Sequence, residues 1–170
     1  MMSGSASAGM ADGAAAVGER LVAIYRAIAA GPMLRLPICN DRLEVQAVDF
    51  RRYDDHAVGV IVTPWFMNVV LAAVANGPAL PPARRGDARA VALPAARIEV
   101  IVGEVPGFGR LDAASLFSPM FGFDGPGATR EAAAAAMAAL FTAPHDDANA
   151  YAAPARDRRA LLFGRGAALS

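Results

Sequence analysis

No charged residue occurs between Ala57 and Ala83, and this restricts the chain to two kinds of structure. The stretch is long enough to cross a bilayer as one helix, or it forms strands buried inside a sheet. Pro64 and Asn68 stand near the centre of its most apolar part, and a proline there interrupts a helix. The residues before Pro64 are mostly β-branched, as is typical of strands. We therefore predict two buried strands joined across Thr63-Pro64-Trp65, and no membrane span.

A helix is predicted on each side of the strand-forming region. Between Gly13 and Ala30 the apolar residues fall on one helical face, and Gly31-Pro32 ends the helix. The alanine-rich stretch from Ala128 to Phe141 is the second predicted helix. Its predicted buried stripe consists of Ala132, Ala136, Ala139 and Leu140, with Met137 and Phe141 beside it.

Short strand patterns fill the region between the helices. They cover residues 43–50, where the alternation slips at Val48 as at a β-bulge, and residues 57–63, 90–93, 98–102 and 113–117. The pairs 43–50/57–63 and 90–93/98–102 are predicted hairpins. We predict an α+β fold: a mainly antiparallel sheet of about five strands in hairpins, flanked by an N-terminal and a C-terminal helix.

The chain has the size of one domain. We assign residues 13–143 to a single α+β domain, residues 1–12 to a flexible lead and residues 144–170 to a mobile tail. All sixteen basic residues are arginine, and sixteen acidic residues balance them. Nucleic-acid binding is disfavoured, because phosphate neutralisation by a basic surface supplies most of that affinity.

Catalytic and metal-binding side chains are scarce. Cys39 is the single cysteine, and His56 and His145 are the only histidines. Their spacing matches no metal-ligand pattern, so we predict no metal and no cofactor. The enzyme hypothesis left open is a Cys39 nucleophile with His56 as its base, which requires a thiol of lowered pKa.

The N-terminal residues MMSGSASAGMADGAAAVGER lack the positive start and leucine-rich centre of a secretory signal. The three Arg-Arg pairs are internal and precede no signal-like apolar segment. We therefore expect the protein to stay in the cytoplasm, whose reducing conditions also suit a single free cysteine.

Four segments occur in the order in which a known family carries them. They are residues 36–50 (LPICN running into VQAVDF), 62–68 (VTPWFMN), 101–109 (IVGEVPGFG) and 115–121 (SLFSPMF), followed by an alanine-rich helix. In this ordered set the chain resembles the HybE/HupJ family of [NiFe]-hydrogenase assembly chaperones. The resemblance runs from about Gly18 to Pro144 and leaves the tail unexplained. Cys39 stands where we expect a different apolar or aromatic residue.

The resemblance implies a cytoplasmic hydrogenase maturation chaperone and not an enzyme. Such a protein would bind the precursor of a [NiFe]-hydrogenase small or large subunit until its cofactors are complete. The small subunit carries a twin-arginine signal, so the chaperone would act before export. Some members of the family are linked to a rubredoxin. This chain has no cysteine pairs to hold the iron of a rubredoxin, so such a partner would be a separate protein.

The two apolar motifs supply the candidate site, because aromatic anchors give contact area and methionine adapts to varied shapes. The predicted partner-binding residues are Thr63, Pro64, Trp65, Phe66, Met67, Asn68, Phe117, Ser118, Pro119 and Phe121. We expect Val62, Val69 and Leu71 to be buried, and burial is favoured for both Phe117 and Phe121. The alternative function is a small-molecule-binding domain with an apolar pocket around Trp65.

Overall fold

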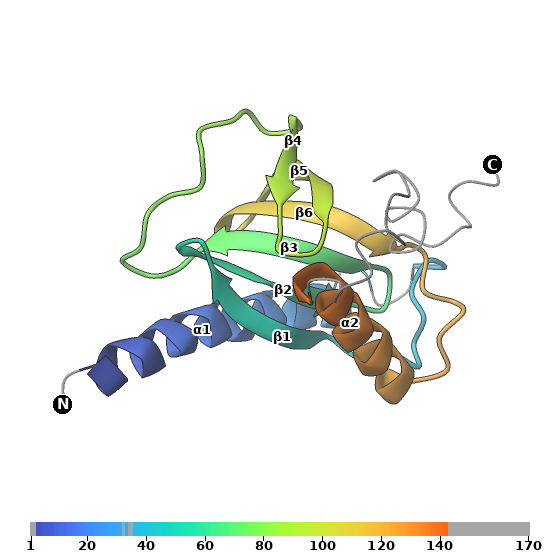
Figure 1. Ribbon diagram of the computed structural model, residues 1–170. Coiled ribbons are helices and arrows are strands. Elements are labelled where there is room, and N and C mark those ends of the chain that lie inside the picture. Colours follow the sequence, from blue (N-terminus) through green and yellow to red (C-terminus); the bar gives the residue numbers. More distant parts are fainter. Residues whose placement is uncertain (1–2, 32, 34–35, 143–170) are drawn as a thin grey trace, which may run out of the picture.

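The computed structural model describes residues 3–31, 33 and 36–142, with side chains from Gly13 onward. The described chain forms two helices and one six-stranded antiparallel sheet of strand order β1-β2-β3-β6-β5-β4 (Figure 1). The elements are α1 (Ser3–Ala30), β1 (Gln46–Tyr53), β2 (His56–Val62), β3 (Met67–Ala73), β4 (Ala88–Ala92), β5 (Arg97–Val105), β6 (Gly109–Phe117) and α2 (Pro126–Phe141). The predicted α+β fold with flanking helices is confirmed, with six strands where about five were expected.

Helix α1 covers one face of the sheet, over β1 and β2. Its buried residues are spaced by three to four positions, as one helical face requires, and include Ala14, Val17 and Leu21. They pack against Ile61 of β2 and Val70 of β3. The helix begins at Ser3, ten residues before the predicted start at Gly13, and so includes most of the segment assigned to a flexible lead.

Glycines allow α1 and β2 to close on the aromatic ring of Phe50. A Cβ atom added to Gly59 would lie 2.4 Å from a ring carbon of Phe50, and one added to Gly18 would lie 3.0 Å from that ring. Phe50 belongs to a β-bulge, since the register of β1 against β2 shifts between Val48 and Arg51. The predicted bulge is thereby confirmed, and it sets a large ring between two residues without side chains.

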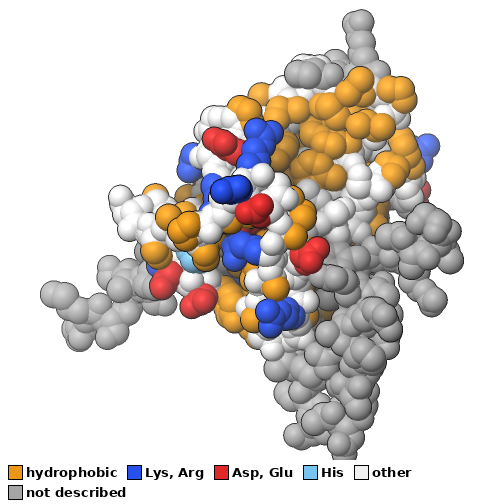
Figure 2. All heavy atoms as spheres, turned by 90° about the horizontal axis from the view of Figure 1, so that it is seen from above, with side chains coloured by type: hydrophobic (Ala, Val, Ile, Leu, Met, Phe, Trp, Pro, Cys, Tyr) orange, Lys and Arg blue, Asp and Glu red, His pale blue; other side chains and the backbone are white. Residues whose placement is uncertain are grey.

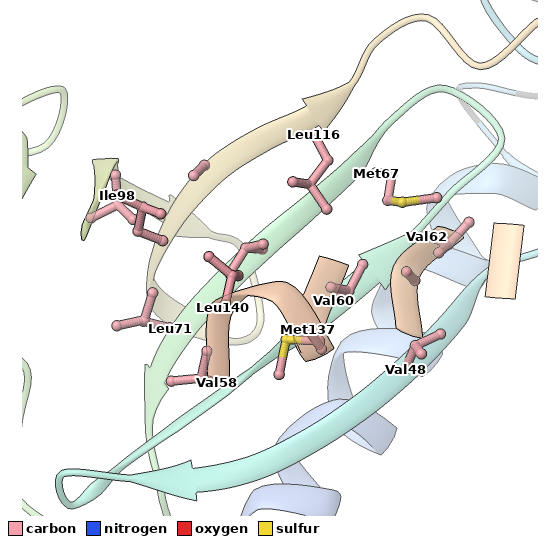
Figure 3. Packing of buried hydrophobic residues seen from close by; sticks show 14 of the residues in the cluster. Val48, Val58, Val60, Val62, Met67, Leu71, Ile98, Leu116, Met137 and Leu140 are labelled. Atoms are coloured by element: carbon pink, nitrogen blue, oxygen red, sulfur yellow. The ribbon is translucent and has the colours of Figure 1, made fainter. Parts of the chain in front are cut away.

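Helix α2 lies on the opposite face of the sheet, and side chains from several strands point toward it (Figure 3). Its buried residues are Thr129, Ala133, Met137 and Leu140. The predicted alanine stripe is wrong by about one position, because Ala139 is exposed and Ala132 and Ala136 are only half-buried. Alanine on every side of this helix leaves its buried face poorly marked in the sequence, and Met137 and Leu140 decide the orientation by their larger apolar area.

The uncharged stretch forms the middle of the sheet, with β2 and β3 joined across Thr63–Phe66 as predicted. In β2, alternate residues enter the two cores, so that Val58 and Val60 face α2 whereas Ala57 and Ile61 face α1. A strand covered on both faces needs apolar residues throughout, which explains the absence of charge. Within residues 3–31, 33 and 36–142, no helix is long and apolar enough to cross a membrane.

The second predicted hairpin is also present. Strands β4 and β5 pair across a turn in which Leu93 N–H donates to Ala96 C=O at 2.8 Å. The turn predicted at residues 105–109 joins β5 to β6, with positive φ angles at Gly107 and Gly109. Strand β6 then inserts beside β3, which brings the beginning of the SLFSPMF motif next to the start of β3.

Candidate functional site

The turn between β2 and β3 is organised around the buried side chain of Thr63. Its hydroxyl oxygen accepts hydrogen bonds from the backbone N–H groups of Trp65 at 3.2 Å and Phe66 at 3.0 Å. Its own N–H donates to the Phe66 carbonyl at 2.8 Å. Thr63 and Pro64 are both buried, so these two residues shape the turn and present no side chain to solvent.

Asn40 joins this turn to two other segments. The Asn40 N–H donates to the carbonyl of Pro64 at 2.8 Å. Its side-chain amide donates to the carbonyls of Met120 at 2.9 Å and Phe123 at 3.0 Å. Asn40 is only 7% exposed, so these bonds are shielded from water. We call the region that it joins, residues 36–40, 63–66 and 117–123, the three-segment surface.

Large hydrophobic side chains point outward around this junction. Leu36 is 43% exposed, Ile38 is 48% exposed and Phe121 is 57% exposed. Leu36 and Ile38 lie within four residues of Asn40, and Phe121 follows Met120, whose carbonyl Asn40 binds. The other large hydrophobic side chain exposed among the described residues is Ile101 of β5, at 47%. Three of the four therefore belong to the three-segment surface.

The space-filling view shows hydrophobic side chains gathered on one part of the described surface. They lie at the upper right of Figure 2, whereas most of the arginine, aspartate and glutamate side chains in view lie at its centre and left. This end of the molecule is where β6 ends and β3 begins in Figure 1. Exposed apolar area of this kind marks an interaction site more often than single scattered side chains do.

Edge-to-face aromatic contacts support the surface from below. The ring of Tyr25 in α1 lies 6.3 Å from Trp65 and 5.4 Å from Phe66, between ring centroids. Burial raises the pKa of the Tyr25 hydroxyl, so this ring stays neutral at physiological pH. In the third segment, Phe117 and Phe123 meet at 5.0 Å. Trp65 and Phe66 are thus half-buried and fixed in orientation.

The structure changes the roles of several predicted site residues. Met67 is 0% exposed and belongs to the core beneath α2, so it offers no contact to a partner (Figure 3). Asn68 is half-buried within β3, which pairs with β2 on one side and β6 on the other. The backbone of β3 is therefore hydrogen-bonded on both sides, so β3 offers a peptide partner no free strand edge beside Asn68.

The second motif is more open than expected. Phe117 is half-buried, whereas Phe121 is exposed, so the expected burial of Phe121 is wrong. Ser118 and Pro119 are also exposed, and the Ser118 hydroxyl donates to the Trp65 carbonyl at 3.5 Å. TPWFMN and SLFSPMF therefore lie side by side, as their assignment to one candidate site requires. The expected burial of Val62, Val69 and Leu71 is confirmed.

Sequence reasoning missed Leu36, Ile38 and Asn40 as members of the site. The segment LPICN was noted only as part of the family resemblance. Its position between a helix and a strand, with no periodicity, carries no signal of which side chain faces out. The available hint in the sequence was the position of two large apolar residues, Leu36 and Ile38, on either side of a proline in a loop.

Cys39 and His56 do not form a catalytic pair. Cys39 lies beside Asn40 near the end of β2, and His56 begins the same strand, which spans about 20 Å. The Cys39 thiol donates to the Met33 carbonyl at 2.9 Å, and burial raises its pKa. His56 Nε2 lies 3.2 Å from the Ala79 carbonyl. Within the described residues, no three His, Cys, Asp or Glu side chains gather as a metal site would require; His145 lies outside them.

A cavity of about 640 Å³ lies elsewhere, between α1 and β1. It is lined by residues such as Val22 and Phe50 and contains five charged side chains. Trp65 does not line it. The apolar pocket that the alternative function places around Trp65 therefore does not coincide with this cavity.

Comparison with known proteins identifies a family for nearly the whole chain. The family model described as "[NiFe]-hydrogenase assembly, chaperone, HybE" matches residues 16–164. The match extends beyond α2 and corrects the expectation that the family pattern leaves the tail unexplained. The chain is 44% identical over 167 residues to a hydrogenase expression/formation protein HupJ of Bradyrhizobium diazoefficiens, covering 96% of each chain.

Two further similarities add detail. The solution structure of HybE from Escherichia coli resembles this fold with a TM-score of 0.59 at 22% identity, covering 88% of this chain and 90% of that one. A probable rubredoxin HupJ of Rhodobacter capsulatus is 42% identical over 50 residues, which is 29% of this chain and 18% of that protein.

Proposed function

This chain belongs to the HybE family of [NiFe]-hydrogenase assembly chaperones, and we propose that it binds the precursor of a [NiFe]-hydrogenase subunit before the cofactors of that subunit are complete. The proposed client is the small or large subunit, with the small subunit, which carries a twin-arginine signal, held until export. The proposed place of action is the cytoplasm.

The observation that carries this proposal is the exposure of Leu36, Ile38 and Phe121 around Asn40. Exposed large apolar side chains cost free energy in water, and a partner that covers them recovers it. Trp65 adds a rigid aromatic edge at the same place. We expect an unfinished subunit to expose apolar surface that is buried once its assembly is complete, which would make the two surfaces complementary in chemistry.

The proposed action is binding and not catalysis. The one thiol has a raised pKa, which keeps it in the less nucleophilic protonated form. The polar side-chain atoms of Asn40 and Thr63 form hydrogen bonds within the protein, with the turn at Pro64 and with residues 120–123. The polar groups at the surface thus hold the loops in place and leave the apolar side chains to meet the partner.

A separate rubredoxin is the second proposed partner. The motivation is the resemblance of part of this chain to a protein named as a probable rubredoxin. Rubredoxin-type iron needs several cysteine thiolates, and this chain has one cysteine. The iron would therefore be carried by the other protein.

The test compares two sets of exposed hydrophobic residues. Ile38→Ser with Phe121→Ser removes apolar area from the three-segment surface, and Ile101→Ser removes a side chain of similar exposure from β5. Tagged full-length proteins are recovered from a host that expresses the hydrogenase, and unprocessed subunits are identified by mass spectrometry. We expect the double variant to lose the subunit and Ile101→Ser to retain it. Equal recovery by both, with folding verified, would remove the three-segment surface from consideration.

A further inference from the structure

The cavity between α1 and β1 has the form of a groove with an apolar floor. Val22 and Ala23 of α1 face Ala47 and Phe50 of β1 across it. Ala23 is exposed and Val22, Ala47 and Phe50 are half-buried, so the floor retains apolar area that the described residues do not cover. A volume of about 640 Å³ is enough for several side chains of a peptide.

Charged side chains stand around this floor. Glu19, Glu44, Arg26 and Arg130 line the groove, and among the described residues none of these four takes part in an ion pair. Asp49 also lines it and pairs with Arg51. The lining therefore has three carboxylates and two guanidinium groups. A segment that carries both positive and negative side chains could form ion pairs with both kinds of group.

The groove runs along a free edge of the sheet. In the described part of the chain β1 pairs with β2 alone, so alternate N–H and C=O groups of β1 face away from the sheet. Such an edge accepts another extended segment through main-chain hydrogen bonds. A segment lying there would gain these bonds and the apolar floor together.

The course of α2 brings the following part of the chain to this edge. Gln46, at the start of β1, accepts a hydrogen bond from Thr129 in the first turn of α2. At the other end, the ring of Phe141 meets Tyr53 at 5.4 Å, and the guanidinium of Arg51 lies 4.6 Å from the Phe141 ring centroid. Helix α2 thus runs parallel to β1, and the chain leaves it beside the last residues of β1.

The residues after α2 have the composition that the groove suits. The family match continues to residue 164, well beyond α2, so this part of the chain is shared with the family. Residues 155–164 read ARDRRALLFG and combine three arginines and one aspartate with the apolar run Leu161-Leu162-Phe163. We propose that residues 155–164 bind in the groove between α1 and β1, antiparallel to β1, as an added edge segment.

The direction and reach are consistent with this. Residues 143–154 connect α2 to the proposed segment, and twelve extended residues span up to about 40 Å. Strand β1 itself is about 27 Å long, so the connection can turn back at Tyr53 and reach the groove. The arginines of the segment would meet Glu19 and Glu44, and its leucines and phenylalanine would cover Val22 and Ala23.

The test places a paramagnetic label in the full-length chain. Cys39→Ser keeps a donor for the Met33 carbonyl and leaves the thiol of Ala160→Cys as the one site for a nitroxide. Amide NMR signals of Ala23, Ala47 and Phe50 are expected to lose intensity. A matched label at Ala168→Cys, outside the family match, should affect them less. Losses centred on Ile38 and Phe121, or spread evenly over the domain, would overturn the proposal.

A second variant separates docking from chance proximity. Leu162→Asp with Phe163→Asp should restore the groove signals, and the β1 amides that face away from β2 should exchange with solvent about tenfold faster. Unchanged signals and exchange rates would contradict docking by these residues. The remaining possibility is that the segment binds in the groove of a second copy of the chain. To test it, chains that carry the nitroxide but no NMR isotope are mixed with isotope-enriched chains that carry no nitroxide. Signal loss in that mixture would assign the segment to a second copy and overturn binding within one chain.

Discussion

Met67 and Phe121 are large apolar residues from two of the motifs that carry the resemblance, and one is buried whereas the other is exposed. Met67 is 0% exposed beneath α2, whereas Phe121 is 57% exposed in the loop after β6. Met120, the neighbour of Phe121, is fully buried. Apolar character therefore does not distinguish a core residue from a contact residue; the position relative to a covered sheet face does.

The largest expected loss of stability comes from truncating the buried residue of this pair, Met67. Met67→Ala should lower the free energy of unfolding by about 2–5 kcal/mol, because it leaves a cavity in the core. Phe121→Ala is the matched control and should change it by less than about 0.5 kcal/mol. Urea unfolding measures both. Equal losses would mean that Phe121 is covered in solution and is not a free contact residue.

Asn40 should show the next effect, since it joins the buried and exposed parts. Asn40→Ala removes the side-chain donor to the carbonyls of Met120 and Phe123, and of these two the Met120 carbonyl keeps the Phe123 N–H at 3.3 Å; the loss should cost about 1–3 kcal/mol. Asn68→Ala serves as control, because among the described residues the Asn68 side chain makes no hydrogen bond. The urea midpoint should fall further for Asn40→Ala than for Asn68→Ala. Loss of client binding in Asn40→Ala at a temperature where it remains folded would show that the loops need this junction.

Alkaline pH should produce a smaller effect at the same junction. Burial raises the pKa of the Cys39 thiol above its unfolded value of about 8.5. The stabilisation from the neutral thiol is therefore complete below that pH and is lost as the pH rises through the folded-state pKa. Urea midpoints between pH 7 and pH 10 should fall less for Cys39→Ser than for the wild type. Tyr25, whose pKa is also raised, contributes to both and cancels. Parallel falls would place the thiol in water.

The smallest expected effect is at Ser118. Its hydroxyl reaches the Trp65 carbonyl at 3.5 Å from an exposed position, so Ser118→Ala should change the free energy of unfolding by less than about 0.5 kcal/mol. Thr63→Val, at the buried end of the same turn, removes an acceptor for two N–H groups and should cost about 1–3 kcal/mol. A larger loss for Ser118→Ala than for Thr63→Val would reverse the assignment of buried and exposed sides.

Much of the fold was accessible from the sequence, and the candidate site was accessible only in part. Alternation and β-branched residues located β2 and the bulge near Val48, and a helical pattern located α1. The two motifs were correctly associated, and hydrogen bonding between β3 and β6 explains why. The exposure of Phe121 and the burial of Met67 were beyond local pattern, because a loop residue has no period from which its direction follows.

The sequence by itself determined the family, the class of fold, the central uncharged strands and the places where the chain turns. These depend on interactions between residues close in the chain, or on an ordered set of motifs that needs no coordinates. Tertiary structure alone decided that residues 36–40 and 117–123 meet through Asn40, across about eighty positions. It also decided which apolar side chains remain uncovered. Both outcomes depend on the order in which the strands lie side by side in the sheet. Strands that are neighbours in the sheet can be far apart in the sequence, and no local preference encodes that arrangement.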